Sequence, residues 1–83
     1  MRIPLESILY LESRRHYLMV YARCGTFRMR GKISEYAERL REAGFVQIHR
    51  CYVVNDARVR RRATGVVVLA TGEELPVGRR YRG

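Results

Sequence analysis

The sequence predicts a mostly β domain with a single α-helix. Two observations support this fold class. Several short segments alternate apolar and polar residues or are rich in β-branched and aromatic residues, which is typical of strands. Only one segment has apolar residues at helical spacing. A chain of 83 residues has room for one domain, so we treat residues 1–83 as a single unit.

Three strands are expected before the helix. The first, Ile8–Ser13 (ILYLES), alternates loosely, and the second, Tyr17–Arg23 (YLMVYAR), places its odd-numbered tyrosines and methionine on one face. The third, Thr26–Arg30 (TFRMR), alternates cleanly, so that Arg28 and Arg30 face away from its two apolar residues.

The helix is expected at Ile33–Ala43. Its apolar residues recur at i, i+3, i+4 and i+7 and form one stripe: Ile33, Tyr36, Ala37 and Leu40. Glu35 near its start and arginines near its end suit the helix dipole. Gly44 follows as a residue that can end the helix in a left-handed conformation.

The second half of the chain has more strand signals. Strands or apolar strand-like segments are expected at Phe45–Ile48, Tyr52–Val54, Val66–Ala70 and Glu74–Val77. A hairpin turn at Thr71–Glu73 joins the last two. The segment Arg58–Arg62 (RVRRR) is dominated by cations.

The charge points to an anionic partner. Seventeen Lys and Arg residues oppose eight Asp and Glu residues, a net charge of +9. This excess favours nucleic acid, an anionic membrane or an acidic protein. Apolar runs such as Tyr17–Ala22 are too short to span a bilayer, and the N-terminus lacks the apolar core of a signal peptide. Cys24 and Cys51 form no C-x-x-C motif, so we expect a cytoplasmic chain with free thiols.

No constellation of residues indicates catalysis or metal binding. The two histidines and two cysteines lack the paired spacing of a structural zinc site. Hydroxyl, thiol and imidazole groups are present, but no local signature joins them into a nucleophilic site. The scattered glycines form no phosphate-binding loop. We therefore expect neither an enzyme nor a cofactor, and no small-molecule substrate.

Cations instead gather in segments expected to be loops. These are Arg14–His16 after the first strand, His49–Arg50 after a central strand, and Arg79–Arg80 after the last strand. Loops on a rigid sheet are common positions for binding residues. If the three loops converge, they form one basic surface suited to guanine edges and phosphates. Spacing alone is equally compatible with three unrelated solvated loops.

Three blocks of the sequence form a recognisable set: ILYLES followed by a short basic turn and His16–Tyr17, GFVQIHRCYVVN at Gly44–Asn55, and ELPVGRRY at Glu74–Tyr81. Together they resemble a known family, the LytTR-type DNA-binding domains that serve as output domains of bacterial response regulators. The central block is the most specific. The order and spacing of the blocks extend the resemblance over Pro4–Tyr81, nearly the whole chain.

The resemblance implies a fold and a mode of binding. The fold would be an elongated multi-sheet β-sandwich of short strands, whose loops enter successive major grooves of bent double-stranded DNA. The base-contacting roles would fall on His16, Arg50 and Arg79. The neighbours suited to the DNA backbone would be Arg14, Arg15, Tyr52 and Arg80. Family members also commonly bind paired repeats as homodimers.

The sequence departs from the family pattern at two positions. Cys51 stands where the family has serine after His-Arg, and Gly78 stands where it has serine before the last arginine. Both changes remove hydroxyl groups that could bind phosphates. The chain also starts near the first block and ends just past the last. Family members usually have a further N-terminal strand, a short C-terminal tail and an attached receiver or membrane segment, so we expect an excised domain or a shortened member.

The function expected from these observations is sequence-specific binding of double-stranded DNA by a bacterial transcription regulator. Two alternatives remain open at this point. One is a protein-interaction module of the same fold that regulates a related DNA-binding partner. The other is a small basic RNA-binding domain, which would bind single-stranded RNA more tightly than duplex DNA.

Overall fold

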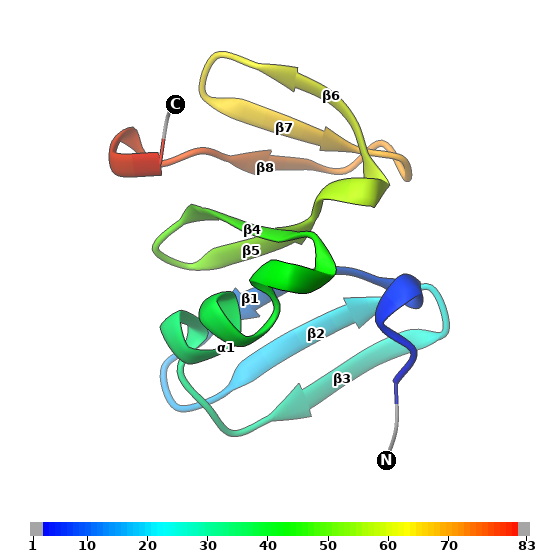
Figure 1. The fold of residues 1–83 in the computed structure, drawn as a ribbon, viewed down its shortest axis with the longest axis vertical. Coiled ribbons are helices and arrows are strands. Elements are labelled where there is room, and N and C mark those ends of the chain that lie inside the picture. Colours follow the sequence, from blue (N-terminus) through cyan, green and yellow to red (C-terminus); the bar gives the residue numbers. More distant parts are fainter. Residues whose placement is uncertain (1–2, 82–83) are drawn as a thin grey trace.

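A five-stranded antiparallel sheet forms the centre of the molecule in the computed structural model, which describes residues 3–81 (Figure 1). Its strands are β1 (Ile8–Ser13), β2 (Leu18–Ala22), β3 (Gly25–Met29), β4 (Phe45–His49) and β5 (Tyr52–Asn55). They are ordered β3-β2-β1-β5-β4. The central strand β1 therefore pairs on one side with β2 and on the other with β5.

A second antiparallel sheet follows in the chain. It has the order β6-β7-β8, with β6 at Val59–Ala63, β7 at Val66–Leu69 and β8 at Glu74–Pro76. This sheet packs across β4 and β5 at the upper end of the molecule in Figure 1. The molecule is elongated, with extents of 35 × 23 × 23 Å. The two antiparallel sheets and the single α-helix found within residues 3–81 confirm the predicted mostly β architecture.

The α-helix α1 (Ile33–Arg39) covers the opposite face of the five-stranded sheet. It begins at Ile33, as predicted, but it ends four residues before the predicted end at Ala43. Leu40 leaves the α conformation (φ −98°, ψ 1°), and the short 3-10 helix η2 (Arg41–Ala43) completes the segment. Gly44 has φ +90° and carries the chain into β4, which confirms its predicted role.

Two apolar cores lie on the two faces of the central sheet. Between the sheet and α1 lie Ile8, Leu11, Leu18, Val20, Phe45 and Val53, with the helical stripe packed against them. Between the two sheets lie Tyr10, Ile48, Val54, Val67, Leu69 and Leu75. Burial on both faces makes the five-stranded sheet a rigid base for the turns at its ends.

The cation-rich segment, for which no strand was predicted, forms one in the structure. Residues Val59–Ala63 form β6, the edge strand of the second sheet, and pair with the buried strand β7. Four of its five residues are exposed. An edge strand exposes much of its side-chain surface, so arginines are accepted there, and charges on an edge also oppose pairing with other chains.

The end of β5 is fixed by the buried side chain of Asn55. Its Nδ2 donates a 2.9 Å hydrogen bond to the carbonyl oxygen of Ile8, and its Oδ1 accepts one of 3.2 Å from the backbone N–H of Ala57. The first bond ties β5 to the start of β1, and the second caps the 3-10 helix η3 (Asp56–Arg58). Asn55 thereby directs the chain from the first sheet to the second.

Candidate nucleic-acid interface

Two exposed turns lie side by side at one end of the five-stranded sheet, on the left of Figure 1. They join β1 to β2 and β4 to β5. Because β1 pairs with β5 in antiparallel register, with Glu12 opposite Tyr52, the end of β1 lies beside the start of β5. The backbone N–H of Ser13 donates a 2.8 Å hydrogen bond to the carbonyl oxygen of Cys51. This bond joins the two turns directly.

A third basic segment reaches the same end from the second sheet. It is the 3-10 helix η4 (Arg79–Tyr81), which follows β8. The backbone N–H of Gly78 donates a 2.8 Å hydrogen bond to the carbonyl oxygen of Ile48, at the end of β4. A hollow at this junction, the Arg50–Arg79 hollow, is lined by His49, Arg50, Gly78, Arg79, Arg80 and Tyr81. The structure thus brings two of the predicted base-contacting arginines together.

The glycine at position 78 permits this close approach. A Cβ atom there would lie 3.1 Å from Cδ2 of Tyr81 and 3.5 Å from the imidazole ring of His49. The first distance is tighter than ordinary van der Waals contact, so any side chain would displace the Tyr81 ring. Gly78, which replaces the family serine, therefore lies where η4 packs closely against the chain.

The third predicted base-contacting residue, His16, lies in a second hollow on the β1–β2 turn. The His16 hollow is lined by His16, Tyr17, Arg28, Met29 and Arg30. The guanidinium carbon of Arg28 lies 5.2 Å from the centre of the Tyr17 ring, a cation–π contact. His16 thus has two basic neighbours, Arg28 in β3 and Arg30 just after that strand.

The predicted DNA-contacting residues differ in whether their side chains are bonded to Glu12. The three predicted to contact bases are all exposed: His16, Arg50 and Arg79. Arg15 and Arg80, predicted to contact the backbone, are exposed as well. Arg14 and Tyr52 are instead held by the carboxylate of Glu12, although half of the Arg14 side chain (51%) remains accessible.

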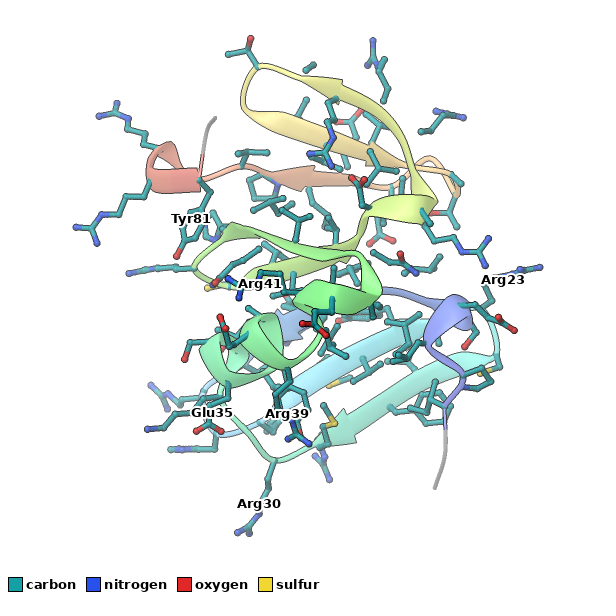
Figure 2. The ribbon with its side chains drawn as sticks, in the orientation of Figure 1. Arg23, Arg30, Glu35, Arg39, Arg41 and Tyr81 are labelled. Atoms are coloured by element: carbon teal, nitrogen blue, oxygen red, sulfur yellow. The ribbon has the colours of Figure 1, made fainter. Side chains whose placement is uncertain are left out.

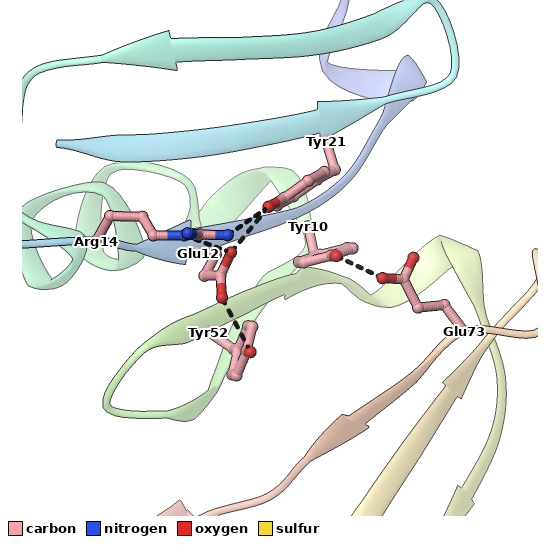
Figure 3. A network of polar contacts seen from close by, with 6 residues as sticks. All are labelled: Tyr10, Glu12, Arg14, Tyr21, Tyr52 and Glu73. Atoms are coloured by element: carbon pink, nitrogen blue, oxygen red, sulfur yellow. Dashed lines mark hydrogen bonds and ion pairs between the residues drawn. The ribbon is translucent and has the colours of Figure 1, made fainter.

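Glu12 is the centre of a polar network between the two turns (Figure 3). Its Oε1 accepts hydrogen bonds from Nε of Arg14 at 3.1 Å and from the hydroxyl of Tyr21 at 2.8 Å. Its Oε2 accepts one from the hydroxyl of Tyr52 at 3.1 Å. The three donors come from the β1–β2 turn, from β2 and from β5, so one carboxylate links three parts of the sheet end.

The network shifts the pKa values of its members in opposite directions. Burial acts to raise the pKa of Glu12, but hydrogen bonds from Tyr21, Arg14 and Tyr52 outweigh it and leave that pKa below the ordinary carboxyl value. The pKa of Tyr21 and the pKa of Tyr52 are raised, first by burial and then by their interactions with Glu12. The stable state near neutral pH is a charged carboxylate with neutral phenols.

Aromatic rings extend this network along the sheet. The Tyr10 and Tyr21 rings stack with centroids 4.5 Å apart. The Tyr52 ring lies 5.5 Å from the imidazole of His49, which lines the Arg50–Arg79 hollow. The Tyr10 and Tyr52 ring centroids lie 6.0 Å apart, so packed rings run from Tyr21 of β2 to His49 at the junction of β4 and η4.

The two hollows carry positive charge without local neutralisation. Among the described residues that line them, none is acidic. Three carboxylates outside the hollows have partners of their own: Asp56 pairs with Arg62, Glu38 pairs with Arg41, and Glu73 accepts a hydrogen bond from a tyrosine. An end of this kind attracts anionic ligands and suits phosphate and guanine edges.

The family model described as the LytTr DNA-binding domain matches residues 1–83, the whole chain. The chain belongs to this family. The LytTr domain is similar to the CO-responsive transcriptional regulator RcoM of Rhodospirillum rubrum, with 33% identity over an alignment that covers 93% of this chain and 35% of the relative. The chain thus spans about a third of the length of that curated relative.

A solved structure has the same fold as this LytTr domain. It is the LytTr DNA-binding domain of a protein described as a methyl-accepting/DNA response regulator from Bacillus cereus. The two match with a TM-score of 0.86 and 22% identity, over 98% of this chain and 79% of the other. The likeness confirms the predicted fold class.

Two basic residues beside His16 were missed as site residues in the sequence. Arg28 and Arg30 line the His16 hollow, and Arg30 points away from the sheet (Figure 2). Their alternation with apolar residues placed them on the outward face of β3. The antiparallel hairpin returns that strand to the β1–β2 turn, since Leu18 pairs with Met29. Alternation combined with hairpin pairing would have found them.

Within residues 3–81, the LytTr domain has neither a helix that could span a membrane nor a cluster of metal-binding side chains. The helices in that range are too short or too polar to cross a membrane. The same residues contain no group of three or more His, Cys, Asp or Glu side chains arranged to hold a metal ion.

Proposed function

We propose that this LytTr domain binds double-stranded DNA sequence-specifically and serves as the output domain of a cytoplasmic bacterial transcription regulator. In this proposal the domain catalyses no reaction. The observation that carries the proposal is the arrangement of His16, Arg50 and Arg79. All three are exposed at one end of a rigid sheet, on segments joined by backbone hydrogen bonds or strand pairing. Family membership supports DNA as the ligand.

The proposed base contacts follow from the chemistry of the three side chains. The planar guanidinium of Arg50 or Arg79 can donate two hydrogen bonds to O6 and N7 of guanine in the major groove. The imidazole of His16 can donate to or accept from a base edge. Because two of these residues share a hollow and His16 lies at a separate turn, we assign them to neighbouring parts of one bent duplex.

The proposed backbone contacts surround the base contacts. Arg15 and Arg80 adjoin the base-contacting residues in sequence and are exposed. Arg14 and Tyr52 are proposed as further contacts, using the part of each side chain that Glu12 leaves accessible. Phosphate neutralisation would supply much of the affinity, so binding should fall steeply with salt, by roughly 0.9 log units per contact for each tenfold rise in salt.

The proposal includes a second copy on the DNA. Two domains would occupy paired repeats as a homodimer, each placing its three basic segments in one repeat. The repeat spacing would then follow the helical repeat of the duplex, as expected for symmetric or tandem readers of DNA.

Selection of bound duplexes from a random pool tests the proposal. The expected result is enrichment of a short motif, present twice at fixed spacing, with tighter binding to that motif than to a random duplex of equal length. Equal retention of all duplexes would contradict specific reading. Tighter binding to single-stranded RNA would identify an RNA-binding domain. No retention of any nucleic acid would favour a protein-interaction module.

A further inference from the structure

Glu12 occupies a position between the strands that lead to the two neighbouring turns. It lies one residue before the end of β1 and is opposite Met19 of β2 on one side and Tyr52 of β5 on the other. Its side chain is largely buried, with 19% of its surface exposed. A negative charge near a DNA-binding end opposes binding. A carboxylate at this position therefore calls for a compensating structural role.

The contacts of Glu12 are directed to the segments that carry the proposed base contacts. Arg14, one of its donors, is two residues before His16 in the β1–β2 turn. Tyr52, another donor, is two residues after Arg50. Tyr21 fixes the same carboxylate oxygen from β2. Charge-assisted hydrogen bonds of this kind are directional and strong, so the two turns share one anchor.

We infer that Glu12 is a positioning residue for DNA reading, whose carboxylate holds the β1–β2 turn and the β4–β5 turn at a fixed separation. The inference rests on the proposed function. Base-edge hydrogen bonds require placement of the donors within about 0.5 Å. Glu12 touches no base in this account: by holding Arg14 and Tyr52 it fixes the segments that carry His16 and Arg50. Its effect should therefore appear in discrimination between DNA sequences and not in general affinity.

Two variants separate positioning from charge. Glu12→Ala removes the anchor and the charge together. Glu12→Gln removes only the charge, because its amide oxygen can accept from Arg14 and Tyr21 while its NH₂ group donates to the hydroxyl oxygen of Tyr52. If Glu12 acted only as a repulsive charge, both variants would bind every duplex more tightly. Positioning predicts that they differ from each other.

The experiment measures binding of the full chain to a duplex selected from a random pool and to a random duplex of equal length. The readout is the specificity ratio, which is the dissociation constant for the random duplex divided by that for the selected duplex. We expect Glu12→Ala to lower this ratio about tenfold, comparable to the loss of one base-pair contact. Glu12→Gln should stay within about twofold of the wild type, since it can stay hydrogen-bonded to the same three side chains, with the bond to Tyr52 reversed in direction. Glu42→Ala, which removes the same charge from an exposed position in η2, should leave the ratio unchanged.

Several outcomes would overturn the inference. An unchanged ratio in folded Glu12→Ala would do so, as would equal ratios for the alanine and glutamine variants. If circular dichroism shows that Glu12→Ala is unfolded, Tyr21→Phe and Tyr52→Phe replace it. Each removes one donor hydroxyl, and we expect a decrease in the ratio of about threefold, the scale of one hydrogen bond. No decrease in either variant would contradict positioning.

The same experiment distinguishes failure of the inference from failure of the proposed function. If the wild-type chain binds selected and random duplexes equally, sequence-specific reading itself is wrong and the inference falls with it. If the wild-type chain discriminates and the Glu12 variants discriminate equally well, only the inference is wrong. A lost phosphate contact in Tyr52→Phe would weaken both duplexes alike and would leave the ratio unaffected.

Discussion

The hydroxyl of Tyr10 donates a 2.6 Å hydrogen bond to Oε2 of Glu73, and this bond joins the two sheets (Figure 3). Tyr10 lies in the central strand β1 and is only 4% exposed, whereas Glu73 lies in the exposed turn between β7 and β8. Glu73 directly precedes β8, at the end of that strand far from η4. The Gly78–Ile48 backbone bond lies at the other end of β8, near η4. The second sheet is therefore held on the first at both ends of β8.

Tyr10→Phe should lower the free energy of unfolding by about 1 kcal/mol, the usual net value of one hydrogen bond. The ring and its packing are kept, and exposed Glu73 can bond to water instead. Urea unfolding monitored by circular dichroism measures the change. Tyr36→Phe is the matched control, because the Tyr36 hydroxyl takes part in none of the side-chain hydrogen bonds found within residues 3–81. An equal loss in the two variants would contradict the assigned role of the bond.

Alkaline solution should destabilise the domain through its tyrosines. Burial, followed by the hydrogen bond to Glu73, raises the pKa of Tyr10, and the pKa values of Tyr21 and Tyr52 are raised as well. A raised pKa in the folded state gives stability that is fully present below the unfolded value, about 10 for tyrosine. That stability is lost as the pH rises above this value, because the unfolded chain releases its protons first.

Urea unfolding between about pH 7 and pH 11 tests this pH dependence. The free energy of unfolding should decrease above about pH 10, and the decrease should be less steep in Tyr10→Phe, which lacks one of the shifted groups. A slope that does not change in Tyr10→Phe would show that Tyr10 titrates alike in the folded and unfolded chains.

Local patterns predicted the elements of this fold whose apolar residues pack into a core. Ile8–Ser13 was predicted with the bounds that β1 has, because its apolar residues face two cores. The start of α1 at Ile33 and the turn at Gly44 also follow from local rules. Strand β6 was missed because it carries three arginines and is held by pairing with β7, which no local pattern reports.

The candidate site was predictable only in part for the same reason. The resemblance of the sequence blocks named His16, Arg50 and Arg79, but their shared location depends on the pairing of β1 with β5 and on the Gly78–Ile48 bond. Glu12 is the clearest case. It is an ordinary polar residue near a strand end, and its donor Tyr52 is 40 positions away in the chain. Such contacts become visible only with the tertiary structure.

Arg79 and Arg80 are adjacent in η4 and should have different roles. Arg79→Ala should weaken binding to the selected duplex by about 1 to 3 kcal/mol and relax the preference at one base pair, because a guanine contact is lost. Arg80→Ala should weaken selected and random duplexes alike, as expected for a phosphate contact. Equilibrium titrations with both duplexes measure the two effects. Equal losses on both duplexes for both variants would contradict this division of roles.

Arg28 and Arg30 should contribute to affinity through phosphates beside the β1–β2 turn. Each arginine lines the His16 hollow, so replacing either by alanine should reduce the slope of log affinity against log salt by about 0.9. Arg23→Ala is the matched control. Arg23 follows β2 at the end of the strand opposite the β1–β2 turn, on the right of Figure 2, and its loss removes the same charge. Salt titrations of the selected duplex should therefore show wild-type slope for Arg23→Ala, and an equal reduction in all three variants would indicate an effect of net charge alone.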